Sequence, residues 1–147
     1  MRIEYETEIL GTPETVFPWI GEPEKAMKWQ KNVKEGEVLI SKSEVVGTTF
    51  RETIEEGGKT LEMLGVITKY VKNNTIEFHI KSKIHEFDVA YSLEAKKEST
   101  LVCIESIIKW KFPMNIVSLF LARTMKKGII RQLESELIEL KRLCESG

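Results

Sequence analysis

The chain has 147 residues, of which 41% are hydrophobic, and its 22 Lys and Arg residues nearly balance its 23 Asp and Glu residues. This length is typical of one domain, and the hydrophobic fraction is ordinary for a globular protein with its own core. A net charge of −1 argues against a nucleic-acid-binding protein, which normally has a strong basic excess, and against general disorder. We therefore predict one folded domain over residues 1–147 that does not bind nucleic acid.

The cysteines and the N-terminus give no sign of a metal site or a targeting segment. Cys103 and Cys144 have no Cys or His neighbour at the spacing of metal ligands, and two thiols do not make a disulfide framework. We interpret both as reduced structural residues and expect no metal and no cofactor. The first residues are charged rather than apolar, and no run approaches the ~18 apolar residues of a membrane span. We predict a cytoplasmic protein without integral membrane association.

The first predicted elements are a strand and two short helices. Polar and apolar residues alternate over residues 2–10, which is the period of a half-buried strand. Residues 12–14 then supply a Thr N-cap, a first-turn Pro and a first-turn Glu, which predict the start of a helix. Pro18 lies within its first two turns, so this helix is short or bent. A second helical piece begins at Pro23.

The middle of the chain reads as a succession of strands rich in Val, Ile, Thr, Phe and Tyr. Gly57-Gly58 and Asn73-Asn74 suit hairpin turns, because these residue types tolerate a positive φ. The turn near Ser82 lacks such residues, so the pattern defines its boundaries least well. We predict strands at residues 33–41, 48–56, 59–71, 75–81, 84–95 and 100–112.

After Pro113 the apolar residues recur every three or four positions, which predicts an amphipathic helix of about 30 residues, near 45 Å long. An antiparallel sheet with one apolar face needs a cover, and only this helix has a matching length. The predicted class is therefore α+β. It is a helix-grip fold, in which a curved seven-stranded antiparallel sheet surrounds a long C-terminal helix and two short helices follow the first strand.

This architecture predicts a hollow interior. A helix about 10 Å wide does not fill the trough of a seven-stranded sheet, so we expect a space flanked by the two short helices. The more apolar face of each strand gives a mostly apolar lining. Gly65 on that face makes room for a guest or bends its strand, and both interpretations stay open. The predicted ligand-binding residues are Trp29, Phe50, Met63, Gly65, Phe78, Phe87, Tyr91, Ser106, Trp110, Leu119, Ala122 and Met125.

Several short motifs along the chain form a recognisable series. A proline-started helix bears Val16-Phe17, an acid-proline step follows at residues 22–24, then come Trp29 and, before a strand, Val46-Gly47. In this series and in residues 65–70, the chain resembles the START/Bet v 1-like (SRPBCC) superfamily over essentially its full length. The likeness is strongest to the polyketide cyclase/dehydrase and lipid-transport branch. The resemblance implies a ligand cavity between sheet and C-terminal helix, with an entrance near the short helices, and it supplies no universal catalytic residue.

Three polar residues, Glu52, Tyr91 and Ser106, fall on the otherwise apolar inward face. An unpaired buried polar group costs about 1 to 3 kcal/mol, so such residues are expected to be paired or functional. Burial would raise the pKa of Glu52 and let it act as a general acid or base on a carbonyl substrate, with Tyr91 as hydrogen-bond donor. The alternative, which we favour, places Glu52 at the rim of the sheet or beside a lysine. For Tyr91 we favour orientation of a ligand over catalysis.

Two further features leave alternatives open. His79 and His85 do not form a metal site by themselves, and His79 alternates with inward residues, so we expect it to face solvent.

Residues 112–121 are apolar on more than one side of the helix. This segment could be an entrance flap, a dimer contact or a membrane-touching tip. We favour its burial under an adjoining hairpin, and a homodimer stays compatible with the sequence.

The leading functional prediction is a binding protein for a small hydrophobic ligand, a lipid or a polyketide-like molecule. The first alternative is an enzyme of cyclase, dehydratase or isomerase type that uses Glu52 or Tyr91. The second alternative is a protein-interaction module that modulates a chaperone or a toxin-antitoxin partner. A solidly filled interior would favour this last alternative.

Overall fold

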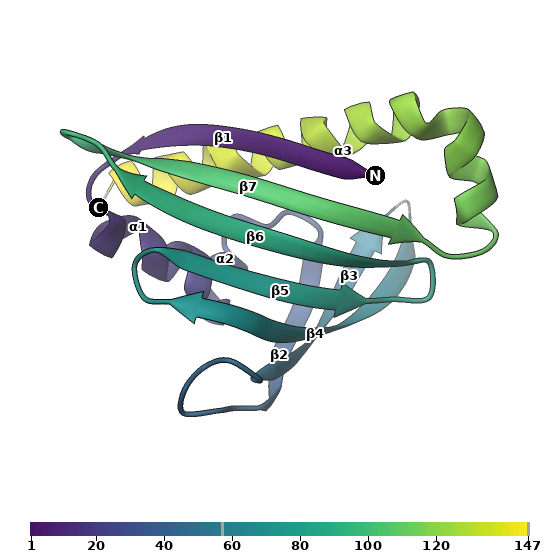
Figure 1. The fold of residues 1–147 in the computed structure, drawn as a ribbon, viewed down its shortest axis with the longest axis horizontal. Coiled ribbons are helices and arrows are strands. Elements are labelled where there is room, and N and C mark those ends of the chain that lie inside the picture. The colour runs from purple at the N-terminus through teal and green to yellow at the C-terminus, as the bar shows by residue number, and fades with distance from the viewer. Residues whose placement is uncertain (57, 147) are drawn as a thin grey trace.

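The computed structural model describes residues 1–56 and 58–146, in which one curved sheet runs beside a long helix (Figure 1). The strands form a seven-stranded antiparallel sheet with the order β1-β7-β6-β5-β4-β3-β2, which confirms the predicted helix-grip fold. The observed strand boundaries lie within two residues of the predicted ones. The elements are β1 (Arg2–Leu10), α1 (Pro13–Gly21), α2 (Pro23–Ala26), β2 (Val33–Ile40), β3 (Thr49–Glu56), β4 (Lys59–Val71), β5 (Thr75–Lys81), β6 (His85–Ala95), β7 (Ser99–Trp110) and α3 (Met114–Glu145).

The strand order places β1 and β2, which are consecutive in the chain, at opposite edges of the sheet. The connection between them must therefore cross from one edge to the other. Helices α1 and α2 make this crossing and lie at the end of the sheet where α3 finishes (Figure 1). They close that end of the concave face.

The turns show how different side chains allow the chain to reverse. Asn73 adopts a positive φ of 62° in the β4–β5 hairpin, and Gly58 has a φ of 79°, as predicted for both turns; Gly57 lies outside the described residues. Between β5 and β6, the Ser82 hydroxyl instead accepts hydrogen bonds from the backbone N–H groups of Ile84 and His85, each at 3.2 Å. A serine side chain thus satisfies the amides of a turn that lacks Gly and Asn.

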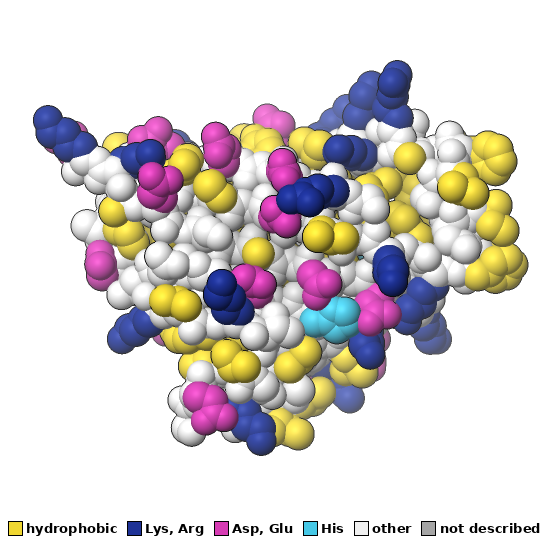
Figure 2. Space-filling view, in the orientation of Figure 1, with side chains coloured by type: hydrophobic (Ala, Val, Ile, Leu, Met, Phe, Trp, Pro, Cys, Tyr) yellow, Lys and Arg dark blue, Asp and Glu magenta, His cyan; other side chains and the backbone are white. Residues whose placement is uncertain are grey.

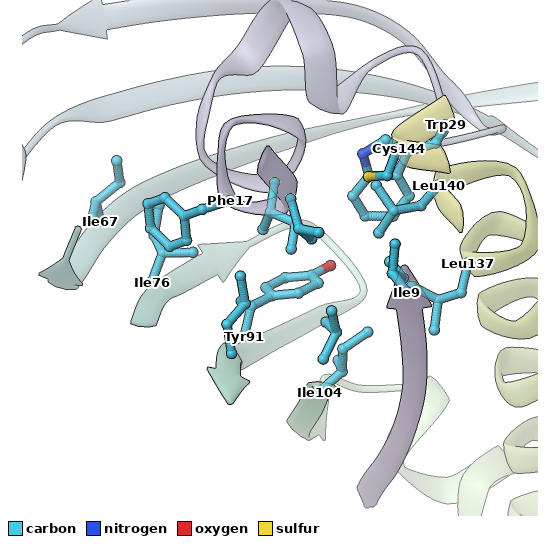
Figure 3. Close-up of a cluster of buried hydrophobic side chains, with 14 residues drawn as sticks. Ile9, Phe17, Trp29, Ile67, Ile76, Tyr91, Ile104, Leu137, Leu140 and Cys144 are labelled. Carbon is cyan, nitrogen blue, oxygen red and sulfur yellow. The ribbon is translucent and has the colours of Figure 1, made fainter. Parts of the chain in front are cut away.

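The hydrophobic core fills the end of the molecule near α1 (Figure 3). Ile9 of β1, Phe17 of α1 and Leu140 of α3 are buried together there. Trp29 is also buried, and its indole N–H donates a hydrogen bond of 2.7 Å to the backbone carbonyl of Trp19. This bond satisfies the one polar atom of the largest core side chain and ties the segment after α2 to α1.

Helix α3 consists of two parts with different environments. Leu137, Leu140 and Cys144 in its C-terminal part are buried against the sheet and α1. Leu121 has non-helical backbone angles (φ −115°, ψ 16°), and the part before it projects beyond the end of the sheet (Figure 1). No helix in the two described ranges combines the length and apolar character needed to cross a membrane.

The expected burial of residues 112–121 under a hairpin is wrong. Leu119 is 79% exposed and Phe120 is 82% exposed. The neighbouring β5–β6 connection spans only residues 82–84, so it is too short to fold over the helix. Among residues 1–56 and 58–146, no element covers Leu119 and Phe120 in the first turns of α3.

Candidate functional site

A pocket of about 400 Å³ lies on the concave face of the sheet, beside the core. All seven strands line it, together with the end of α1, the α2 region and the C-terminal part of α3. Its walls reach the surface where α2, β2 and α3 approach one another, since the wall residues Pro23, Gly36 and Gln132 are exposed. Eight of the residues predicted to bind a ligand line it: Trp29, Phe50, Met63, Phe78, Phe87, Tyr91, Ser106 and Trp110.

The three predicted residues in the first half of α3 lie elsewhere. Leu119 and Ala122 are exposed, and Met125 is half-buried outside the pocket walls. The first α3 residue in the walls is Ile129. The bend of α3 and its projection past the sheet separate the earlier turns from the pocket.

Gly65 makes room for a neighbouring side chain of the protein. It pairs with Phe50 across the β3–β4 ladder, and a Cβ atom added to Gly65 would lie 2.2 Å from Cζ of the Phe50 ring. The ring therefore lies against the glycine, and it packs edge-to-face with the Phe78 ring, with the two ring centroids 5.7 Å apart. The Phe50 ring, which is part of the pocket wall, therefore fills the space that a side chain at Gly65 would occupy.

Two carboxyl groups and one phenol share the polar part of this pocket. Glu52 of β3, Glu136 of α3 and Tyr91 of β6 all line it. Burial raises the pKa of Glu52 above the ordinary Glu value of 4.5, and the charge of Glu136 raises it further. Burial, followed by the charges of Glu136 and Glu52, raises the pKa of the Tyr91 hydroxyl. Burial in this apolar pocket thus raises the pKa of each of these groups above its ordinary value.

Glu136 is a pocket residue that was not predicted from the sequence, although its position in the helical pattern could have indicated it. It lies three residues after Leu133 and four before Leu140, on the apolar stripe of α3, where a charged residue is unexpected. Burial raises the pKa of the Glu136 carboxyl, while the backbone N–H and the charge of Lys31 oppose that shift. The Lys31 N–H donates to Glu136 Oε2 at 2.9 Å, which fixes this carboxylate at the mouth of the pocket.

Two polar atoms in the pocket walls are buried without a hydrogen-bond or ion-pair partner among the described residues. They are the indole N–H of Trp110 and the side-chain oxygen of Gln30. The first is a donor and the second an acceptor, and each costs stability unless it is paired. A bound molecule with complementary groups could pair with both.

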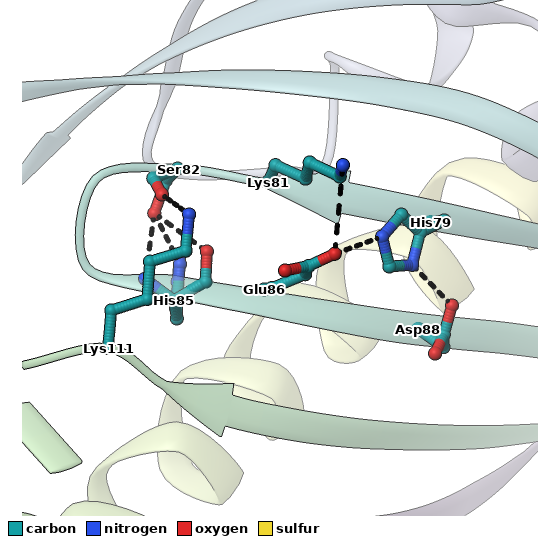
Figure 4. Close-up of polar contacts among 7 residues, drawn as sticks. All are labelled: His79, Lys81, Ser82, His85, Glu86, Asp88 and Lys111. Carbon is teal, nitrogen blue, oxygen red and sulfur yellow. Dashed lines mark hydrogen bonds and ion pairs between the residues drawn. The ribbon is translucent and has the colours of Figure 1, made fainter.

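The two histidines have separate environments (Figure 4). His79 lies on the outer face of the sheet, as predicted, with its ring nitrogens 2.7 Å from Asp88 and 2.7 Å from Glu86. These acids raise the pKa of His79, with the Asp88 hydrogen bond as the main cause. His85 instead lines the pocket and stacks on Trp110, with ring centroids 5.3 Å apart. The described residues contain no group of three or more His, Cys, Asp or Glu side chains suited to a metal ion.

An antiparallel sheet curved around a long C-terminal helix, with a pocket between them, defines the helix-grip class of folds, and solved structures of a START superfamily protein and of Ara h 8.0201 share this fold with the chain. The family model for polyketide cyclase / dehydrase and lipid transport matches residues 1–145. The chain therefore belongs to that family, and the resemblance inferred from its motifs is confirmed.

Solved structures support the fold at low sequence identity. The protein TTHA0849 from Thermus thermophilus has a TM-score of 0.83 at 19% identity, covering 99% of this chain and 98% of its own. A START superfamily protein from Mycobacterium smegmatis has a TM-score of 0.81 at 16% identity, covering 99% and 97%. Ara h 8.0201 has a TM-score of 0.73 at 16% identity, covering 100% and 99%. A search of curated proteins found no match.

Proposed function

We propose that the protein binds a small hydrophobic ligand, a lipid or a polyketide-like molecule, in the pocket between the sheet and α3. The observation that carries this proposal is a pocket of about 400 Å³ with mostly apolar walls. Pockets for small molecules usually enclose about 300 to 1,000 Å³. Removal of apolar ligand surface from water, at about 25 cal/mol per Å², would supply most of the affinity.

The polar groups of the pocket suggest how such a ligand is oriented. Trp110 offers an unpaired donor, Gln30 offers an unpaired acceptor, and Glu52 and Tyr91 offer hydroxyl or carboxyl groups. A ligand with an apolar body and one or two oxygen-containing groups matches this arrangement. We restrict the proposed contacts to the eight predicted residues in the walls, because Leu119, Ala122 and Met125 lie outside them.

The test is native mass spectrometry of the purified protein, followed by extraction and identification of any retained molecule. We expect an adduct whose mass corresponds to a lipid or an aromatic polyketide. If the protein carries nothing and none of a panel of fatty acids, phospholipids and polyketides raises its melting temperature, the ligand-binding proposal is wrong.

A second candidate function is an enzyme of cyclase, dehydratase or isomerase type. The observation that favours it is the pair of acids with raised pKa values, Glu52 and Glu136, beside Tyr91 in an apolar pocket. The test compares Glu52→Gln, Glu136→Gln and Tyr91→Phe with wild type in a screen of carbonyl substrates. Glu55→Gln is the control, because Glu55 is exposed on the same strand as Glu52. Equal activity in all variants would exclude this chemistry.

The third alternative, a protein-interaction module, predicts a filled interior, and the pocket does not favour it. A cytoplasmic location belongs to our proposal and agrees with the free cysteines Cys103 and Cys144. Measurement of the thiol content of the protein as isolated under non-reducing conditions tests whether these cysteines stay reduced.

A further inference from the structure

The start of α3 presents apolar side chains to solvent. Residues 112–121, here called the α3 tip, include Phe112, Leu119 and Phe120, which are 74%, 79% and 82% exposed. Ile116 and Leu121 are exposed beside them. Figure 2 shows these apolar side chains gathered at the end of the molecule where α3 begins. A contiguous group of large, exposed apolar side chains usually marks a contact surface.

The sequence around the α3 tip carries only positive charge. Residues 106–133 contain no Asp or Glu, in a protein whose net charge is −1. Figure 2 shows Lys and Arg side chains around the apolar group. No salt bridge involves the basic residues of this stretch in the part of the chain that the structure describes. They are Lys109, Lys111, Arg123, Lys126, Lys127 and Arg131.

The acid nearest in the sheet register, Glu86, is held mainly by basic side chains outside this stretch, although its charge also acts on Lys111. Glu86 pairs with Lys109 across β6 and β7, but its carboxylate accepts a hydrogen bond from His79 and forms an ion pair with Lys81. Lys111 donates to the backbone carbonyl of Ser82 at 2.7 Å and so stays at the base of the tip. Apart from Lys111, the basic side chains of this stretch therefore remain available to an external anion.

The shape of the molecule leaves the tip accessible to a flat surface, since the first part of α3 projects past the end of the sheet (Figure 1). Exposed Phe and Leu side chains ringed by Lys and Arg match a bilayer interface, where apolar groups enter the acyl boundary and cations meet anionic headgroups. We propose that the α3 tip docks the protein onto the surface of a membrane that contains anionic lipids.

A second copy of the chain fits the tip less well. In a symmetric dimer the same patch faces itself across the two-fold axis, so the basic residues of both copies would meet. Like charges at such a contact repel, whereas anionic headgroups would balance them. The charge of the patch thus favours lipid over self-association.

Docking would also bring the pocket close to the bilayer. Trp110 lies two residues before the tip, Ile129 lies eight residues after it on α3, and both line the pocket. A hydrophobic molecule could then pass between bilayer and pocket with a short path through water. This consequence rests on the proposed ligand binding, whereas docking itself does not.

The test is co-sedimentation of the full chain with vesicles of phosphatidylcholine alone or of phosphatidylcholine mixed with phosphatidylserine. We expect binding to the mixed vesicles that weakens as salt is added. The double variant Leu119→Ser, Phe120→Ser should bind at least about 10-fold more weakly, because it removes the inserted side chains. Ile138→Ser, which changes a 64% exposed side chain on the same helix, is the control and should bind like wild type.

Charge reversal tests the electrostatic part separately. Lys126→Glu with Lys127→Glu should weaken binding at least about 10-fold. Lys72→Glu with Lys97→Glu makes the same charge change in turns at the opposite end of the sheet and should retain most of the binding (Figure 1). Light scattering of the wild type without lipid should show a monomer.

Three results would overturn the proposal: no binding to mixed vesicles, equal binding to neutral vesicles, or wild-type affinity in both the Leu119→Ser, Phe120→Ser and the Lys126→Glu, Lys127→Glu variants. A dimer that Leu119→Ser with Phe120→Ser dissociates would overturn it too, and would assign the tip to self-association. Native mass spectrometry of the bound molecule is unaffected by these outcomes, so failure of docking and failure of ligand binding are distinguishable.

Discussion

At the scale of single residues, Gly65 allows the ring of Phe50 to lie close against β4. We expect Gly65→Ala to lower the free energy of unfolding by about 1 to 3 kcal/mol, because its Cβ would overlap the ring. Gly128→Ala is the matched control. A Cβ added to helical Gly128 would meet open space beyond its own helix backbone, so that change should stabilise the protein by up to about 1 kcal/mol. Urea denaturation measures both, and an unchanged Gly65→Ala would show that the ring moves aside freely.

Glu52 makes stability depend on pH. Its pKa is raised in the folded state, mainly by burial, so the folded protein holds this proton more tightly than the unfolded chain. The wild type should therefore lose stability as pH rises from 4.5 through the raised pKa. Glu52→Gln mimics the protonated form and should avoid that loss.

Urea denaturation of the wild type and Glu52→Gln at about pH 4 and about pH 8 checks this prediction. The variant should be the more stable protein at the higher pH, and the two should converge at the lower one. Glu55→Gln, on the same strand but exposed, should show no such pH-dependent gain. If Glu52→Gln gains nothing at the higher pH, the Glu52 carboxylate is well solvated.

At the scale of elements, the two parts of α3 should contribute very differently to stability. Leu140 is fully buried, so Leu140→Ala should cost about 2 to 5 kcal/mol of unfolding free energy. Leu119 is mostly exposed on the same helix, so Leu119→Ala should change it by less than about 0.5 kcal/mol. Denaturant titration compares the two, and similar costs would mean that the first part of α3 packs against the sheet in solution.

At the scale of the whole molecule, ligand binding should depend on the open volume of the pocket. A larger side chain that fills this volume should therefore reduce ligand binding. Ser106 lines the pocket from β7, so the larger side chain of Ser106→Phe should occupy ligand space. Ser92→Phe makes the same change at an exposed position of the neighbouring strand β6. Native mass spectrometry should show the retained molecule in Ser92→Phe at the wild-type level and at least about 10-fold less of it in Ser106→Phe. Equal retention would place the ligand elsewhere.

Much of the fold was predictable from local patterns. The alternation over residues 2–10, the Thr-Pro-Glu helix start and the Asn73-Asn74 turn each reflect a preference of a few neighbouring residues. The inward face of each strand also followed, because a period of two assigns every side chain to one of two faces. That rule placed Phe50, Tyr91 and Ser106 in the pocket walls.

Other features depend on contacts between distant segments. We did not predict the bend at Leu121 or the exposure of the α3 tip. Nor did we predict that Glu52 and Glu136 line the same pocket. A helical period identifies an apolar stripe, but it does not state how much of that stripe the sheet covers. The amino-acid sequence by itself determined the strands, the helices and their apolar faces. Only the tertiary structure decided which part of α3 is covered and which acids share the pocket, because both depend on where strands far apart in the chain come to lie.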